Sequence, residues 1–185
     1  MVDQQRPTNF STAVNRKYPE QVVIAIADDL KGTPNPITLG WTMVTSHQPP
    51  MLAISVAYAR YSYENIKRAK EFVVSFPSKE MAKDALFYGT RSGRDMEKIK
   101  EFGSKTEPCK KISGVIFTEA VANFECRLVG ELPSGDHAIF AGEVVQGWVN
   151  TERRKERLYT LGTGYKMGSV TSNLVVEYSP SLFKK

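Results

Sequence analysis

Short apolar runs, many of them rich in β-branched residues, recur along the chain and predict more strand than helix. Turn-forming stretches such as "DDLKGTPNP" and "SHQPP" separate these runs. The tetrapeptide "PSGD" at 133–136 is typical of a hairpin turn between two long runs. The run at 51–59 is nearly continuous, which favours burial on both faces. The pattern predicts strands over 21–29, 37–46, 51–59, 71–77, 113–132, 137–150 and 158–170.

Three segments between the strands have helical spacing instead, over 61–70, 78–89 and 95–103. Ser62 and Ser78 are the expected N-caps of the first two helices, and Gly89 and Gly103 the expected ends of the last two. Strands, a helical insert and further strands make an α+β chain, and the long hairpin favours an antiparallel barrel. Neither an internal repeat nor a linker is visible. We therefore predict a single domain over 1–185, with 1–17 as a polar N-terminal lead-in.

Composition removes several classes of protein. The chain has 185 residues, 41% hydrophobic and 24% charged, which is typical of a globular protein rather than a disordered one. No apolar run approaches the roughly 20 residues of a membrane span, and the N-terminus lacks the apolar block of a secretory signal. Cys109 and Cys126 show no metal-ligand spacing, and two scattered histidines add little. These features predict reduced cysteines, no metal site and a cytoplasmic location.

The net charge of +5 favours anionic partners only weakly. The basic runs "NRKY", "IKRAK" and "TERRKER" are scattered along the chain, as expected for solvated faces. No pattern of an RNA- or DNA-binding motif accompanies them. We expect no nucleic-acid partner.

Two predicted helix entries carry a hydroxyl and a guanidinium group together. In "GTRSGRDMEKI", Ser92 and Asp95 have the spacing of a capping box, while Gly93 and Arg94 would suit a bound phosphate. The alternative is that Ser92 only caps its helix and Arg94 lies in solvent. In "AYARYSYE", Arg60 and Ser62 repeat the combination. Two such entries in one small domain make a phosphate ligand credible.

Two other features each have a structural and a functional interpretation. The stretch "ITLGWTMVTS" is either an ordinary strand with a polar face or a wall against which a ligand lies. His137, just after the hairpin turn, is either an exposed turn residue or a group that polarises a substrate. No nucleophile elbow, Walker A motif, HExxH motif or GxGxxG motif is present, so a nucleotide-type cofactor would not be held by a Rossmann unit.

Three segments, taken in order, resemble a known family. They are "NPITLGWTMVTSHQPPMLAISVAYARYSYENIKRAKEFVVSFP", "GTRSGRDMEKIKEFG" and "GDHAIFAGEVV". Together they resemble the flavin reductase-like family with the FMN-binding split-barrel fold, most closely its flavoredoxin-type branch. The resemblance covers roughly residues 18–170. It implies an antiparallel split β-barrel with short flanking helices, and a homodimer that binds FMN non-covalently near the subunit interface.

The resemblance also assigns residues by position. It places His137, in the "GDH" segment, close to the flavin and the nicotinamide, as the candidate catalytic residue. Tyr165 falls in the family's glycine–tyrosine segment. The residues assigned to the flavin ring are Thr38, Leu39, Gly40, Trp41, Thr42, Ser55, Val56 and Ala57, and those assigned to the ribityl-phosphate side are Arg60, Ser62, Ser92, Gly93, Arg94 and Lys98.

One loop departs from the family pattern. Many relatives read Pro-Val-Ser-Phe-Asp-Pro-Pro where this chain reads "VTSHQPP" at 44–50, so Ser46 is kept and the Phe-Asp pair is absent. The departure concerns how this loop meets the flavin or the second substrate.

The resemblance implies an FMN-dependent oxidoreductase that takes electrons from NADH or NADPH and passes them through bound flavin to an acceptor. The alternative is a flavoredoxin-like electron carrier that exchanges electrons with redox protein partners and does not use NAD(P)H directly. A non-enzymatic flavin-storage module is a rival from another class. A pyridoxamine-phosphate-oxidase-like domain would also bind FMN, but the "SGRD" and "GDH" segments favour the reductase pattern.

Overall fold

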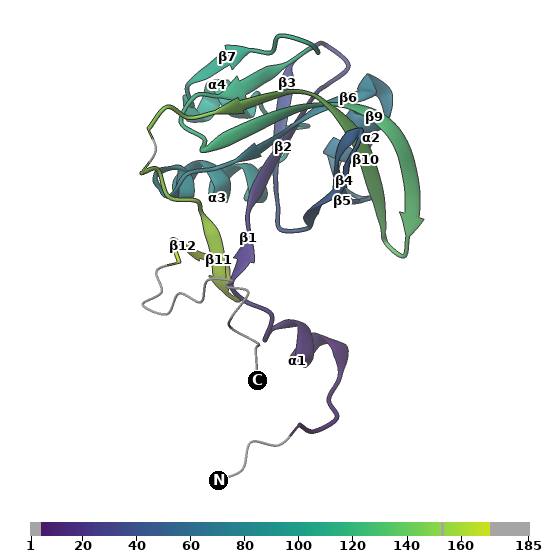
Figure 1. Cartoon of the computed structure of the whole chain (residues 1–185), viewed down its shortest axis with the longest axis vertical. Coiled ribbons are helices and arrows are strands. Elements are labelled where there is room, and N and C mark those ends of the chain that lie inside the picture. Colours follow the sequence, from purple (N-terminus) through teal and green to yellow (C-terminus); the bar gives the residue numbers. More distant parts are fainter. Residues whose placement is uncertain (1–4, 153, 171–185) are drawn as a thin grey trace, which may run out of the picture.

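A seven-stranded antiparallel sheet forms the body of the computed structural model, which describes residues 5–152 and 154–170 (Figure 1). The strand order across this sheet is β3-β2-β6-β9-β10-β5-β4. The strands are β2 (Val23–Asp28), β3 (Pro34–Leu39), β4 (Thr42–His47), β5 (Pro50–Ala57), β6 (Glu71–Phe76), β9 (Ala122–Ser134) and β10 (His137–Val149).

The sheet buries apolar side chains on both of its faces, which explains why β2 reads as a continuous apolar run. Val23 and Ala25 face a core that includes Phe72 and Phe140, with Ile66 of a covering helix. The alternate residues of the same strand belong to a second core on the opposite face, with Tyr88 and Phe117. A strand with a core on each side has no polar face, so its sequence does not alternate between apolar and polar residues.

The predicted strand over 37–46 is instead two strands that lie at opposite edges of the sheet. β3 ends at Leu39 and β4 begins at Thr42, although these two strands occupy the two ends of the strand order. Because only Gly40 and Trp41 join them, the sheet must curl until its edges come close together. The Ser55 backbone N–H donates to the Trp41 carbonyl at 3.0 Å, which extends the β4–β5 ladder up to this corner. The fold is thus the expected α+β arrangement, with a strongly curled antiparallel sheet.

The helices cover the two cores, and several of their ends differ from the predictions. Ser62 lies inside α2 and Gly89 inside α3, so neither marks a helix end. Ser78 precedes the 3₁₀ turn without a side-chain cap. Gly103 ends its helix in the left-handed conformation, as predicted. The helices are α2 (Tyr61–Ala69), the 3₁₀ turn η1 (Lys79–Met81), α3 (Ala82–Thr90) and α4 (Lys98–Phe102).

The long hairpin of β9 and β10 forms as predicted, and its turn at Gly135 and Asp136 lies within the predicted 133–136. Its β9 strand starts only at Ala122, because the predicted run over 113–132 is interrupted after the short β8 (Val115–Phe117). β8 pairs with β7 (Thr106–Pro108) on the side of the second core. Gly142 of β10 lies where a Cβ would come within 2.6 Å of the Phe72 ring, so only glycine fits there.

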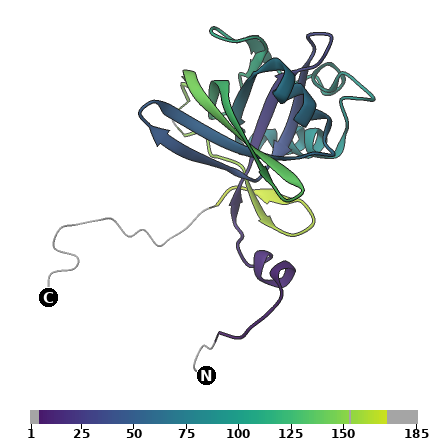
Figure 2. The same ribbon diagram turned by 90° about the vertical axis from the view of Figure 1, so that its right-hand side faces the viewer.

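A second, smaller sheet lies below the main one (Figure 1). It consists of β1 (Glu20–Gln21), β11 (Tyr159–Gly162) and β12 (Lys166–Gly168), in the order β1-β11-β12. β1 connects to α1 (Phe10–Val14), which buries no residue and lies apart from the body (Figure 2). Lys17, the last residue of the lead-in, lies over the Trp41 ring of the body.

Both cysteines are free thiols, and Cys126 is fully buried. Burial raises the pKa of each thiol to about 12, which makes both poor nucleophiles at neutral pH. Over 5–152 and 154–170 no group of His, Cys, Asp or Glu side chains is arranged to hold a metal ion. No helix in the same residues has the length and apolar character needed to cross a bilayer.

Candidate functional site

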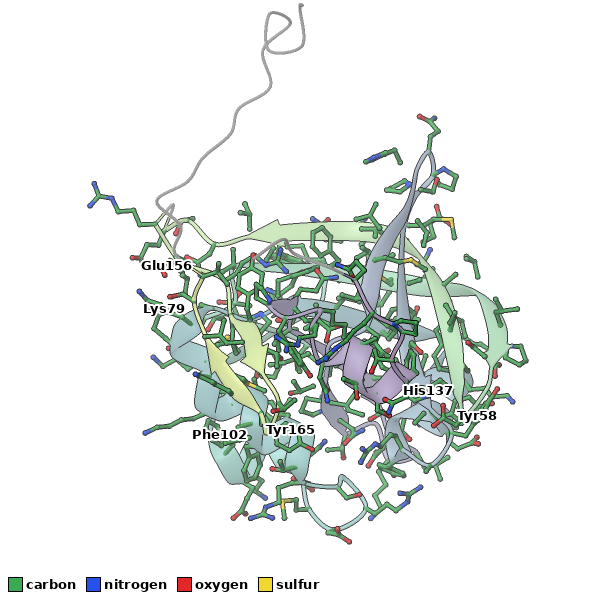
Figure 3. All side chains as sticks on the ribbon, turned by 90° about the horizontal axis from the view of Figure 1, so that it is seen from below. Tyr58, Lys79, Phe102, His137, Glu156 and Tyr165 are labelled. Carbon is green, nitrogen blue, oxygen red and sulfur yellow. The ribbon has the colours of Figure 1, made fainter. Side chains whose placement is uncertain are left out.

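An open slot of about 690 Å³ lies between the curled corner of the main sheet and the small sheet. One wall is the end of β3 with the corner residues, and the opposite side includes Tyr165 from the β11–β12 turn (Figure 3). Side chains of β5, β10 and α3 complete it. The slot is lined by Tyr18, Glu20, Val22, Ile37, Thr38, Leu39, Gly40, Trp41, Ser55, Ala57, Arg60, Ala85, Leu86, Gly89, Asp136, His137, Thr160, Gly162, Gly164, Tyr165 and Met167.

Close packing of α3 on β3 shapes one wall of the slot. The Thr38 hydroxyl donates to the Ala85 carbonyl at 2.6 Å, which joins the strand to the helix. A Cβ on Gly89 would lie 3.3 Å from Thr38 Cβ, so glycine allows this close approach. This explains why Gly89 lies inside α3 instead of ending it.

The mouth of the slot is aromatic and carries two acidic groups. The rings of Trp41 and His137 are 4.8 Å apart, and His137 Nδ1 lies 2.6 Å from a carboxylate oxygen of Asp136. The hydrogen bond with His137 lowers the pKa of Asp136 below its usual value. Lys17 pairs with Glu20 and lies 5.5 Å over the Trp41 ring. His137 is therefore an oriented, partly buried residue of the slot and not a free turn histidine.

A second pocket of about 180 Å³ continues from the slot, and the two share Ile37, Arg60 and Gly89. Three arginines line it, which makes it strongly basic. The pocket is lined by Asn35, Ile37, Ala59, Arg60, Tyr61, Ser62, Tyr88, Gly89, Thr90, Arg91, Ser92, Gly93, Arg94 and Lys98.

The loop before α4 closes this second pocket. The predicted capping box is absent, because α4 begins only at Lys98; Ser92 instead accepts from the Arg94 backbone N–H at 3.2 Å in a local turn. The Arg94 guanidinium group lies 5.2 Å over the Tyr61 ring. A Cβ on Gly93 would overlap Asn35 Oδ1, so glycine is needed for the loop to lie this close to β3.

Asn35 and Ser62 form a polar floor beneath the loop. Asn35 Nδ2 donates to the Ser62 hydroxyl at 2.9 Å, and both residues are buried. Asn35 Oδ1 is buried against Gly93 and has no hydrogen-bond partner among the residues that the structure describes. Ser62 therefore serves the pocket floor rather than the α2 N-cap.

The structure brings most of the predicted site residues together. Thr38, Leu39, Gly40, Trp41, Ser55, Ala57 and His137 line the slot, Ser62, Ser92, Gly93, Arg94 and Lys98 line the second pocket, and Arg60 lines both. Thr42 and Val56 line neither. Val56 points into the first core because strand residues alternate between faces, and the Thr42 hydroxyl donates to the Ala53 carbonyl at 2.9 Å.

Several lining residues come from segments that sequence reasoning did not connect to the site. Tyr18 and Glu20 reach the slot because β1 pairs with β11, a contact between residues far apart in the chain. Thr160 and Met167 enter through the same small sheet. Arg91 directly precedes Ser92, so the cluster of basic residues around "TRSGR" was the available signal for it.

The two connected cavities can hold an extended ligand with a planar end and an anionic end. The slot offers Trp41, Leu39 and Tyr165 beside glycine backbone, which suits a flat ring system. The second pocket offers guanidinium groups and a serine-containing turn, which suit a phosphate. A linker between the two ends of such a ligand would pass Ile37, Arg60 and Gly89, which line both cavities.

Comparison of the fold with solved structures gives close matches. Flavoredoxin from Methanosarcina acetivorans superimposes with a TM-score of 0.83 at 22% identity, covering 98% of each chain. NADH:FAD oxidoreductase SgcE6 of Streptomyces globisporus C-1027 gives a TM-score of 0.78 at 17% identity, covering 93% of this chain and 99% of that one. At these identities the matches establish the fold, which is that of the flavin reductase-like split barrels.

Sequence comparison reaches the same group of proteins. An uncharacterized protein of Archaeoglobus fulgidus is 34% identical over 128 residues, which are 69% of this chain and 71% of that protein. The stachydrine N-demethylase reductase subunit Stc3 of Rhizobium meliloti is 27% identical, and the match covers 69% of this chain but only 53% of Stc3. The sequence profile of the flavin reductase like domain matches residues 15–169. The chain therefore belongs to the flavin reductase-like domain family.

Proposed function

We propose that this protein is an FMN-binding oxidoreductase that takes electrons from NADH or NADPH and passes them through bound flavin to an acceptor. The observation that carries the proposal is that the slot, which suits a planar ring system, continues into the arginine-lined pocket. FMN has a planar isoalloxazine ring at one end and a phosphate at the other, joined by a ribityl chain, which matches a slot that leads into an arginine-lined pocket.

In this proposal the chain's own residues bind and orient the cofactor. Arg60 and Arg94, with the Ser92–Gly93 turn, hold the phosphate by charge-assisted hydrogen bonds. Leu39 and Trp41 pack on the ring, while the backbone at Gly40 faces its polar edge.

FMN is proposed over FAD because the phosphate end is narrow. The second pocket holds about 180 Å³, and the stacked pair of Arg94 and Tyr61 lies on its wall. This volume accommodates a phosphate and part of the ribityl chain. The adenosine half of a dinucleotide would have to lie outside the pocket.

When bound, the flavin supplies a ring that accepts hydride and releases electrons singly or in pairs. His137 lies at the mouth of the slot beside Trp41, where a second planar substrate would enter. Its hydrogen bond to Asp136 fixes the orientation of the imidazole ring. We propose that His137 positions the nicotinamide ring of the donor.

A second candidate is a flavoredoxin-like electron carrier, which the fold match to the Methanosarcina acetivorans flavoredoxin favours. Such a carrier would keep FMN bound and exchange electrons with protein partners. The two candidates differ in whether NADH or NADPH reduces the bound flavin.

An anaerobic visible spectrum separates these candidates. The purified protein, saturated with FMN, should show a flavin spectrum that bleaches on addition of NADH or NADPH. A spectrum that neither nucleotide changes would support the carrier, and a protein that refuses FMN would exclude both. Steady turnover of NADH or NADPH with an added acceptor would exclude a storage module.

His137→Ala should slow bleaching by roughly 10- to 100-fold at saturating FMN, because a misplaced donor no longer meets the ring in reacting geometry. Stopped-flow absorbance measures this rate directly. His47→Ala is the matched control, since His47 is exposed at the end of β4 and lines neither cavity. Equal rates in the His137 variant and the control would remove His137 from the mechanism.

We further propose that the protein acts as a homodimer through the outer face of β4, β5 and β10. Met43 of the edge strand β4 is 54% exposed on this face, and Leu132, which lies opposite Ile139 on the same face, is 61% exposed. Met43 also lines an apolar hollow with Ile139 and Trp41. An exposed apolar face on an edge strand is typical of an interface. Trp41 belongs to this hollow and to the slot, which places the interface beside the proposed flavin.

Met43→Glu should shift the protein from dimer to monomer in light scattering and weaken FMN binding. The physical reason is that a carboxylate would be buried in an apolar contact. Leu30→Glu, in the exposed turn between β2 and β3, is the control and should remain dimeric. A wild-type protein that is monomeric at micromolar concentration would contradict the dimer.

A further inference from the structure

Lys98 is a buried lysine at the start of α4, with only 3% of its surface exposed. Its ammonium group donates to the Pro36 carbonyl, and it also donates to the carbonyls of Tyr88 and Arg91, each at 3.4 Å. The three hydrogens of the ammonium group therefore meet three backbone oxygens. These oxygens come from β3, from α3 and from the loop that closes the second pocket.

Three carboxylates, those of Asp29, Asp95 and Glu97, line a hollow that Lys98 also lines. Among the residues that the structure describes, no carboxylate forms an ion pair with Lys98; its neighbour Glu97 pairs with Lys100 at 3.9 Å. The other charged groups that line the second pocket are the guanidinium groups of Arg60, Arg91 and Arg94. Tyr88 faces Lys98 with its carbonyl, while its hydroxyl group bonds Ser104.

Burial lowers the pKa of Lys98 to about 8. The neutral amine has only two hydrogens, so loss of the proton leaves one of the three carbonyls without a donor. The protonated form consequently ties β3, α3 and the loop together better than the neutral form does. A dianion in the adjacent pocket would favour the protonated form.

We propose that Lys98 is a positioning residue of the anion pocket, whose ammonium group holds the closing loop on β3 and takes up a proton when a phosphate-bearing ligand binds. The proposal rests on the proposed function, because FMN is the phosphate-bearing ligand. It differs from direct phosphate binding, since the hydrogens of Lys98 are directed at backbone carbonyls.

The direction of the pH effect follows from linkage. Near pH 7 Lys98 is mostly protonated with or without ligand, so binding takes up almost no proton. Near pH 8 about half of the free protein carries the neutral amine, and binding should take up as much as about half a proton. At higher pH the affinity for FMN should fall, because each binding event must first protonate Lys98. A phosphate monoester has its second pKa near 6 and contributes nothing in this range.

Isothermal titration calorimetry of the whole chain with FMN measures the proton uptake. Titrations at pH 8 in Tris and in HEPES should give different apparent enthalpies, and the difference should shrink at pH 7. Riboflavin, which lacks the phosphate, should show no difference between buffers. Lys98→Met should abolish the buffer dependence and weaken FMN binding by about 10-fold, while Lys100→Met, an exposed lysine of the same helix, should behave as wild type.

Each result decides the inference. FMN binding with the same enthalpy in both buffers, or an equal effect with riboflavin, would overturn the role of Lys98 and leave the proposed function intact. Absence of FMN binding would overturn the proposed function itself. If Lys98→Met does not fold, the wild-type comparison of FMN with riboflavin still tests the inference.

Discussion

Replacing Arg94 with alanine is expected to weaken FMN binding by roughly 10- to 100-fold while leaving riboflavin binding unchanged. Arg94 lines the second pocket and is held over the Tyr61 ring, so its guanidinium group is already placed for a phosphate. A charge-assisted hydrogen bond contributes about 1.5–3 kcal/mol, which corresponds to this range of affinity. Fluorescence titration of the apoprotein with each flavin measures both affinities.

The comparison of FMN with riboflavin localises the effect of Arg94 to the phosphate. Arg154→Ala is the matched control, because Arg154 is an exposed arginine that lines neither cavity. Arg94→Lys should recover only part of the affinity, since a lysine cannot form a bidentate contact or stack on Tyr61 in the same way. Equal losses for FMN and riboflavin would show that Arg94 supports the slot as a whole.

Replacing Glu125 with alanine should lower the free energy of unfolding by about 3–5 kcal/mol. Glu125 is fully buried, and its carboxylate accepts from the backbone N–H groups of Lys110 and Lys111 at 2.9 and 2.7 Å. It also accepts from Trp148 Nε1 at 2.7 Å. The alanine variant would leave three donors without their acceptor and a space in their midst.

Chemical denaturation measures the effect of Glu125 through the midpoint and slope of the transition. Glu107→Ala, an exposed glutamate of β7, should change stability by less than about 0.5 kcal/mol. Glu125→Gln should fall between the two, because an amide oxygen still accepts. An alanine variant as stable as wild type would mean that the 109–114 loop finds other partners.

The strands of the main sheet were predictable because their patterns are local. The turn residues at 133–136 and the apolar runs on either side of them are enough to predict the β9–β10 hairpin. The corner at Gly40 and Trp41 was not predictable, because the reason for it is the curl of the whole sheet. Nothing in "ITLGWTMVTS" marks the point at which one sheet edge becomes the other.

The candidate site, too, was predictable from the sequence only in part. Spacing made Ser92 and Arg94 candidates for an anion site, but the capping box on which this rested is absent: the helix starts later, and a turn rather than a cap orients these groups. The resemblance supplied the slot residues of β3 and β5, with Thr42 and Val56 as the exceptions. Glu20 and Tyr165 could not be related to one another from sequence, because the small sheet that carries them joins the two ends of the described chain.

The corner between β3 and β4 bears on how proteins with this fold can change the ligand that they bind. The slot lies at the corner that joins β3 to β4, the two edge strands of the main sheet, which do not pair with each other. Substitutions at Gly40 and Trp41 can therefore change which ring fits without breaking the strand pairing that holds the two cores. Gly40 and Trp41 line the slot but belong to neither core, so proteins built on this scaffold can change the slot at these two positions while keeping the same body.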